Sequence, residues 1–217
     1  MGNRAIVKPV GQRIGVYLHW NGGRDSVEAF LKYCEMRGFR DFGGKNADGY
    51  GVARFIQVVS NFFGGALCVG LETGVDMDAA TADMLDNGIY EVDGWKIVAR
   101  CPKGIREQRE YKMQEMLEVI DAAQPREDRF GKRYLRAKEV PTENLRIGDT
   151  VYLYNENAYQ EPKCKGWKVV GIGQQGKWVN GRDVGGVPYI DRYPTLAENN
   201  INNYLIDKKY RATVKKR

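Results

Sequence analysis

The chain has 217 residues, of which 42% are hydrophobic, so it can bury a core as one large domain or two small ones. Its net charge of +6 is uneven, because residues 1–100 carry 11 Lys/Arg against 12 Asp/Glu, whereas residues 101–217 carry 23 against 16. No run of about eighteen uncharged apolar residues is present and the first residues lack the apolar stretch of a signal peptide, so we expect a cytoplasmic protein with no membrane partner.

Two short β-strands are predicted at the start of the chain, over residues 4–10 and 13–20, with a glycine-containing turn between them. In the second strand, apolar residues occupy every other position, which is the period of a half-buried strand. These residues are Ile14, Val16, Leu18 and Trp20. His19 falls between them, so we expect it to point away from the apolar set.

A helix is predicted over residues 24–39, where apolar residues recur on one face. These residues are Val27, Phe30, Leu31 and Cys34. Asp25 and Glu28 are three positions apart, which predicts a variant of the capping box at the start of the helix. Gly38 is a plausible stop signal at its end.

The next segments predict a second helix over residues 52–63, a buried strand over 66–73 and an exposed, irregular acidic loop over 74–88. Residues 89–100 carry the clearest hairpin signal of the chain. Two alternating runs flank Asp93-Gly94, which favours a type I′ turn.

An amphipathic helix of about twenty residues is predicted over residues 104–123. Its apolar stripe consists of Met113, Met116, Leu117 and Ile120. Such a stripe can bind a partner protein, but packing against the sheet of the same domain is its commoner fate.

The periodicity changes after the polar and charged segment 124–133, where we place a domain boundary. Residues 1–124 are predicted to form an α+β domain, with a mixed sheet packed by about three helices. Residues 134–217 are predicted to form a small all-β domain with a basic C-terminal tail.

The C-terminal domain is predicted to contain short strands separated by turns, at the spacing of a small barrel or sandwich. The predicted strands lie within residues 145–155, 165–173, 176–184 and 187–193, and a short helix is predicted over 195–210. The stretch "RIGDTVYLY" resembles the opening strand of many SH3-like barrels.

The residue types argue against metal and redox chemistry. Cys34, Cys68, Cys101 and Cys164 are widely spaced with no C-x-x-C pair, so we expect reduced thiols and neither a zinc site nor a redox motif. His19 is the one histidine, which excludes a His-rich metal centre. We therefore predict that the protein binds no metal and no cofactor, and we assign no residue as catalytic.

The stretch "YLHWNGGRDS" is the first candidate site. A strand, two glycines and a helix start can present free backbone N–H groups to an anion, with the adjacent arginine adding charge. No phosphate-loop motif is present, so we favour the alternative that the glycines form a tight turn and that Asp25 satisfies the helix end. The residues that would bind a ligand here are His19, Trp20, Asn21, Gly22, Gly23 and Arg24.

The C-terminal half is the second candidate site, because it combines excess positive charge with aromatic residues. A small β-barrel that offers aromatic faces beside Lys/Arg can hold single strands or nucleotides. The alternative is that the aromatic residues pack the barrel and that the basic tail is only solvated. The predicted nucleic-acid-binding residues are Tyr152, Tyr154, Lys165, Trp167, Lys168, Trp178, Arg182, Lys208, Lys209, Arg211, Lys215, Lys216 and Arg217.

The first hundred or so residues contain the pattern "GNRAIV…GVYLHWNGGRDSVEAFLKYCEMRGF…YGVARFIQVVSNFFGG…DNGIYEVDGWKIVAR". This pattern resembles a family of proteins encoded by phages and integrative elements of Gram-positive bacteria. The resemblance implies no catalytic residue. It implies a small accessory protein of mobile DNA, for which nucleic-acid handling and interference with host defence are common tasks.

Three functions stay open on these grounds. The first is a non-enzymatic module that binds nucleic acid or a nucleotide through the C-terminal half, with a role against host defence. The second is an inhibitor or adaptor of a host protein, which acts through the helix at 103–123 or the acidic loop at 75–88. The third and weakest is an enzyme that uses His19.

Overall fold

The computed structural model describes residues 3–44, 49–102 and 107–136, together with the backbone of the short strands after residue 137. The chain divides into two compact units, Met1–Arg129 and Phe130–Arg217, and each is described by itself. Within the described ranges, no helix combines the length and the apolar character needed to span a bilayer.

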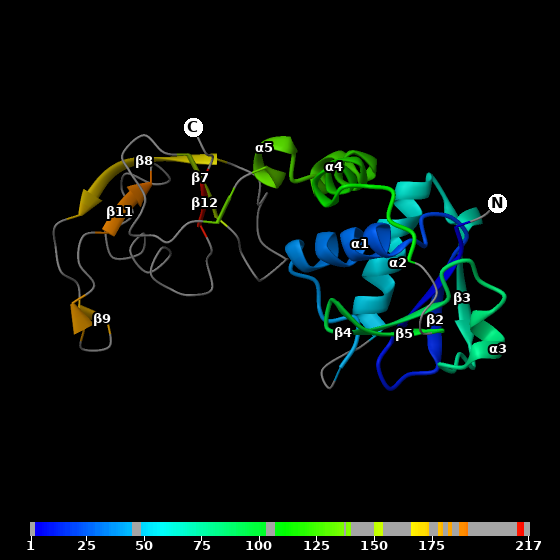
Figure 1. The fold of residues 1–217 in the computed structure, drawn as a ribbon. Helices are drawn as coiled ribbons and strands as arrows, with labels where there is room; N and C mark the ends of the chain where they lie inside the picture. The colour runs from blue at the N-terminus through cyan, green and yellow to red at the C-terminus, as the bar shows by residue number, and fades with distance from the viewer. Residues whose placement is uncertain are drawn as a thin grey trace. The chain divides into compact units, whose positions relative to one another are not determined.

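The first unit is built on a mixed five-stranded sheet in the order β3-β2-β1-β4-β5 (Figure 1). The strands are β1 (Ala5–Pro9), β2 (Ile14–Leu18), β3 (Val69–Thr73), β4 (Ile89–Asp93) and β5 (Lys96–Cys101). β1 and β4 run parallel, and the other neighbouring pairs are antiparallel. A mixed sheet packed by helices confirms the α+β class predicted for this part of the chain.

Three helices lie along one side of this sheet, namely α1 (Arg24–Met36), α2 (Gly49–Phe63) and α4 (Met113–Ala123) (Figure 1). Phe55 of α2 is fully buried at their centre. Its ring centroid lies 6.4 Å from that of Phe30 and 5.0 Å from that of Phe42, both in edge-to-face arrangements. Such pairs add to the stabilisation that comes from burying the rings.

The other side of the sheet is covered by the segment after β3, which includes the short helix α3 (Ala79–Ala82). Side chains of β1 and β4 alternate between the two faces, so this face also needs apolar cover. The buried cluster on it consists of Ile6, Val75, Ala82 and Ile89. The prediction of an exposed, irregular loop over 74–88 is therefore wrong for Val75 and Ala82, which are buried, and for Met77 and Leu85, which pack against the same cluster.

The prediction of a strand over 66–73 is confirmed for residues 69–73, but it is wrong for residues 66–68 and for the expected burial. Residues Ala66–Cys68 form the 3-10 helix η1, and β3 follows as an edge strand whose last three residues are exposed. Among the described strands, β3 pairs with β2 alone. The apolar run in the sequence did not reveal that one side of this strand has no neighbour in the sheet.

The predicted hairpin of β4 and β5 is confirmed, but its turn is shifted by one residue. Asp93 pairs with Lys96, so the turn residues are Gly94 and Trp95. Gly94 has a φ of 60° whereas Trp95 has no positive φ, which excludes type I′. Trp95 is buried and its Nε1 donates to the Phe39 carbonyl oxygen at 3.4 Å, so this turn residue also packs into the core.

In the second unit, the short helix α5 (Lys132–Leu135) precedes an antiparallel sheet in the order β11-β8-β7-β12-β6 and a hairpin of β9 and β10. The strands are β6 (Lys138–Glu139), β7 (Thr150–Leu153), β8 (Gly166–Gly173), β9 (Trp178–Val179), β10 (Arg182–Asp183), β11 (Val187–Ile190) and β12 (Ala212–Val214). β6 and β12 were not predicted, whereas the others lie within the predicted strands. Closure into an SH3-like barrel stays a prediction, and the predicted helix over 195–210 lies outside the described residues.

Replacing Phe55 by Ala should lower the free energy of unfolding by about 3 to 5 kcal/mol, because it leaves a cavity among the other rings. Chemical denaturation followed by circular dichroism would measure the change. Gln57→Ala, on the exposed side of the same helix, is the matched control and should stay within about 0.5 kcal/mol of the wild type. Equal effects of the two substitutions would contradict the central place of Phe55.

Candidate functional site

The turn between β2 and α1 packs tightly against the start of β1. Asn21 has a positive φ of 53°, and the Gly22 N–H donates to the Asn3 carbonyl oxygen at 2.7 Å. A Cβ at Gly22 would lie 2.5 Å from that oxygen and 2.7 Å from the Ala5 nitrogen. Glycine is therefore required at this position because the two chain segments approach closely.

Gly23 is the N-cap residue of α1 and packs against a third segment. A Cβ at Gly23 would lie 2.9 Å from the Gln108 carbonyl oxygen. Asn87 is fully buried beside them and donates from Nδ2 to Asn3 Oδ1 at 2.5 Å and to Gln108 Oε1 at 3.2 Å. Asn87 and Gln108 are not predicted from the sequence, because no local pattern signals a contact between residues that are 84 positions apart, as Asn3 and Asn87 are.

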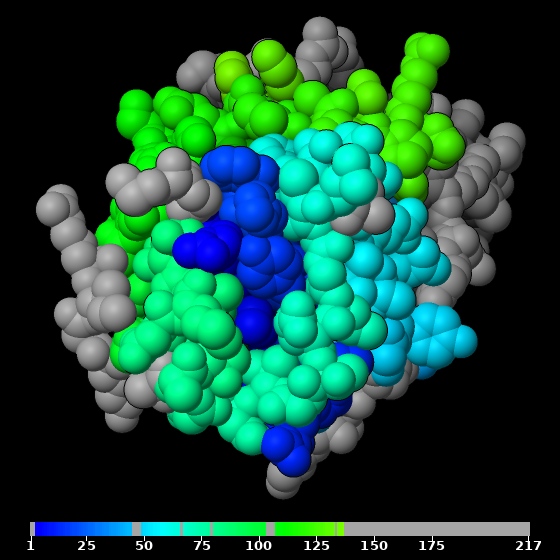
Figure 2. Space-filling model, turned by 90° about the vertical axis from the view of Figure 1, so that its right-hand side faces the viewer, coloured from blue at the N-terminus to red at the C-terminus, as the bar shows by residue number. Residues whose placement is uncertain are grey.

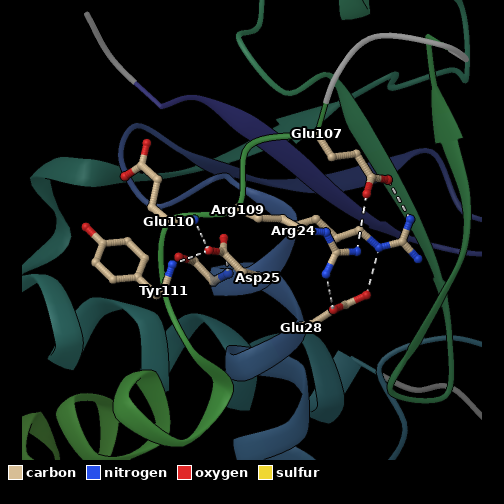
Figure 3. A network of polar contacts seen from close by, with 8 residues as sticks. Arg24, Asp25, Glu28, Glu107, Arg109, Glu110 and Tyr111 are labelled. Atoms are coloured by element: carbon tan, nitrogen blue, oxygen red, sulfur yellow. Dashed lines mark hydrogen bonds and ion pairs between the residues drawn. The ribbon is translucent and has the colours of Figure 1, made fainter.

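The Asp25 carboxylate is buried and accepts hydrogen bonds from three backbone N–H groups (Figure 3). Oδ1 accepts from Ser26 N at 2.7 Å, whereas Oδ2 accepts from Tyr111 N at 2.6 Å and from Glu110 N. The predicted capping box of Asp25 and Glu28 is therefore wrong. Asp25 lies inside the first turn of the helix, and its carboxylate binds the first turn to a segment from a distant part of the chain.

Two arginines and two glutamates form a closed ring of ion pairs beside this carboxylate (Figure 3). Arg24 Nε lies 2.7 Å from Glu28 Oε1, and its Nη1 lies 2.6 Å from Glu107 Oε1. Arg109 completes the ring at 3.3 Å from Glu107 Oε2 and 3.8 Å from Glu28 Oε2. The hydrogen bond to Glu28 is the main cause that raises the pKa of Arg24, and the hydrogen bond from Arg24 is the main cause that lowers the pKa of Glu107.

These contacts explain why the predicted helix over 104–123 begins only at Met113. Because Asp25 accepts from the backbone N–H groups of Glu110 and Tyr111, these groups are not available to continue the helix towards its N-terminus. The shorter helix α4 buries three of the four residues of its apolar stripe, since Met116, Leu117 and Ile120 are at most 6% exposed, whereas Met113 at its start is 39% exposed. These three residues therefore form part of the core of the first unit.

His19 lies beside two aromatic residues at the end of β2. Its Nδ1 is 3.0 Å from the Tyr17 hydroxyl, and its ring centroid is 4.9 Å from that of Trp20 in an edge-to-face arrangement. Trp20 is 41% exposed. In the part of the chain that the structure describes, no carboxylate, serine or cysteine side chain forms a hydrogen bond with this imidazole, and no group of three metal-ligating side chains is present.

The second candidate site is described by backbone register alone. Tyr152 pairs with Gly166 and with Thr213, and Thr150 pairs with Lys168. Residues two apart on a strand share a face, as do directly paired residues, so Tyr152 and Lys168 belong to one face of this sheet. Trp167 pairs with Val151 and belongs to the opposite face.

Of the other residues predicted for this site, two lie on described strands. Arg182 and Trp178 belong to the β9-β10 hairpin, where they pair with Val179 and Asp183. The following lie outside the described residues: Tyr154, Lys165, Lys208, Lys209, Arg211, Lys215, Lys216 and Arg217.

No family model matches the chain, and no curated protein or solved structure matches it either. At the first site, the Asp25 carboxylate accepts hydrogen bonds from backbone amides and Arg24 contacts two glutamates, so these groups mainly bind one another. A ligand-binding role for residues 19–24 stays a prediction.

Replacing Asp25 by Asn should lower the free energy of unfolding by about 2 to 3 kcal/mol, because an amide cannot replace a charged acceptor of three N–H groups. Denaturation monitored by circular dichroism would measure the change. Asp83→Asn is the control, because Asp83 is exposed, and it should change stability by less than about 0.5 kcal/mol. An Asp25→Asn variant as stable as this control would rule out the proposed importance of the contact.

Replacing Glu107 by Gln should remove a pH-dependent part of the stability. The pKa of Glu107 in the folded protein lies below its ordinary value of 4.5, so its contribution is complete above that pH and is lost as the pH falls through the folded pKa. We expect the difference in unfolding free energy between wild type and Glu107→Gln to shrink between about pH 7 and about pH 3. A difference that does not depend on pH would contradict the ion-pair ring.

Proposed function

We propose that this protein binds single-stranded nucleic acid through its C-terminal unit. The observation that carries the proposal is the pairing of β12 (Ala212–Val214) with both β7 and β6. This strand is the centre of the basic segment "KKYRATVKKR" at the end of the chain. Pairing of its centre within a sheet supports the view that this segment is more than a solvated tail.

The distribution of charge supports a polyanionic partner. Residues 101–217 carry 23 Lys/Arg against 16 Asp/Glu, whereas residues 1–100 are close to neutral. Six of these cations immediately precede or follow β12 in the sequence. They are Lys208, Lys209, Arg211, Lys215, Lys216 and Arg217. Neutralising phosphates with such residues releases counterions, which drives binding.

The pairing of β7 supports a preference for single strands. Tyr152 is in register with Thr213 of β12, so an aromatic residue of β7 lies directly opposite the strand that the basic residues flank. Lys168 belongs to the same face of this sheet. Unpaired bases stack on aromatic rings while cations follow the phosphate backbone, and both are needed to hold a single strand. The resemblance to proteins of mobile DNA agrees with such a role.

Two surfaces were considered for binding a partner protein, namely the helix at 103–123 and the acidic loop at 75–88. Both are largely occupied by contacts within the first unit. Three of the four residues of the apolar stripe of α4 are buried, namely Met116, Leu117 and Ile120, and so are Val75 and Ala82 in the acidic segment. Two of the carboxylates in this segment form ion pairs, Asp76 with Arg13 at 2.6 Å and Asp86 with Arg4 at 2.9 Å. Nucleic-acid binding is therefore the function that we put forward.

Fluorescence anisotropy with a labelled single-stranded oligonucleotide tests this proposal. If the six cations around β12 contact phosphates, the logarithm of the binding constant should fall with the logarithm of salt with a slope of about −4. Neutralising them to Gln should weaken binding by at least about tenfold and make the slope shallower. Tyr152→Ala should weaken binding without changing the slope, because stacking involves no counterions.

The control replaces exposed cations of the first unit by Gln, namely Arg13, Lys32, Arg54, Lys96 and Lys112. It should leave the binding constant close to that of the wild type. Binding that does not respond to salt, or an equal loss in the control, would overturn the proposal.

A further inference from the structure

The outer edge of β3 offers a regular row of backbone groups for pairing with another strand. The His19 N–H donates to the Cys68 carbonyl oxygen at 2.9 Å, and β2 and β3 continue from there in an unbroken antiparallel register. In such a ladder, alternate residues direct their N–H and C=O groups to the partner strand. The N–H and C=O groups of Gly70 and Glu72 therefore bond to β2. Those of Val69, Leu71 and Thr73 are directed away from β2.

The opposite edge of the sheet is less suited to pairing. In β5, the register shifts between Glu91 and Val92 of its partner β4, which leaves Val98 without a directly opposed residue. Such a bulge, together with lysine on the strand, protects an edge from pairing, and β5 carries Lys96. β3 has no bulge, no proline and no cation.

The side chains of β3 are compatible with a copy of the same strand. Leu71 is 52% exposed, although it is apolar, and Glu72 is also exposed. In an antiparallel pairing centred on Leu71, Val69 would oppose Thr73 of the second copy and Glu72 would oppose Gly70. No carboxylate would then face its equivalent, and an apolar residue would cover its own symmetry mate at the centre.

The backbone favours this same register independently of the side chains. Val69, Leu71 and Thr73 have outward-directed groups in both copies, and these are the residues that the register brings opposite one another. Each such pair can exchange two hydrogen bonds. A twofold axis through the centre of the paired strands produces this arrangement, as in most homodimers.

We propose that two copies of this chain associate through β3, which joins their two sheets antiparallel with Leu71 opposite Leu71 of the second copy. Figure 2 shows the side of the first unit on which the segments of residues 66–88 (teal) reach the surface beside the N-terminal strands (blue). Leu67, in the helix η1 that immediately precedes β3, is 102% exposed, and Trp20, two residues after β2, is 41% exposed. The proposal does not depend on nucleic-acid binding.

Analytical ultracentrifugation of the full chain, after nuclease treatment, tests the association. The wild type should show a concentration-dependent dimer. Leu71→Lys should raise its dissociation constant by at least about tenfold, because two ammonium groups would face each other. Thr73→Pro should weaken the dimer as well, because it removes an outward N–H that β2 does not use. Val98→Lys, at an equally exposed apolar position on the other edge, is the matched control and should dimerise like the wild type.

A wild type that stays monomeric up to about 100 µM would overturn the proposal, since a specific dimer should be detectable in this range. A dimer that Leu71→Lys and Thr73→Pro leave unchanged would overturn it as well. Circular dichroism of each variant would show that the fold is retained.

Disulfide trapping tests the register. Paired residues in an antiparallel ladder have Cα atoms about 5.5 Å apart, which suits a disulfide. Leu71→Cys should therefore form a crosslinked dimer under mild oxidation, above the background of the wild-type cysteines. Thr73→Cys is the control, because its symmetry mate would lie about 13 Å away along the strand. Equal crosslinking by both variants would contradict the register centred on Leu71.

Discussion

The arrangement of the first unit depends on the buried carboxylate of Asp25. By accepting hydrogen bonds from Ser26, Glu110 and Tyr111, it joins the start of α1 to a segment that lies more than eighty residues further along the chain. This contact holds the segment extended, which places the start of α4 at Met113. A buried carboxylate is tolerated there because backbone donors on both segments satisfy it, and leaving such a charge unpaired would be costly.

Charges in the first unit are used mainly to connect distant parts of its own chain. Arg24 and Arg109 form a ring with two glutamates, and Lys8, which is 5% exposed, pairs with Glu91 across the two central strands at 2.8 Å. Such pairs leave little net charge for a polyanion. The excess of positive charge lies in the second half of the chain, which is why the proposed nucleic-acid site is placed there.

Both faces of the five-stranded sheet are covered, and among the described strands its two edge strands, β3 and β5, pair on one side only. The bulge in β5 and the regularity of β3 make these two edges unequal. The two proposals together describe a dimer that contains two basic units. Two linked sites of modest affinity bind a long ligand more tightly than either alone, because the second binding step becomes intramolecular.

The sequence by itself determined the elements whose signals are local. The alternation in β2, the apolar face of α1 and the turn glycine of the β4-β5 hairpin all predicted the observed structure, because each depends on neighbours within a few residues. It also indicated that Gly22 and Gly23 form a tight turn. The tertiary structure decided what depends on distant contacts: the edge position of β3, the cover that residues 74–88 provide, the start of α4 and the partners of Asp25. Asn87 and Gln108 at the turn could not be found from the sequence, because hydrogen bonds between segments leave no periodic pattern in either of them.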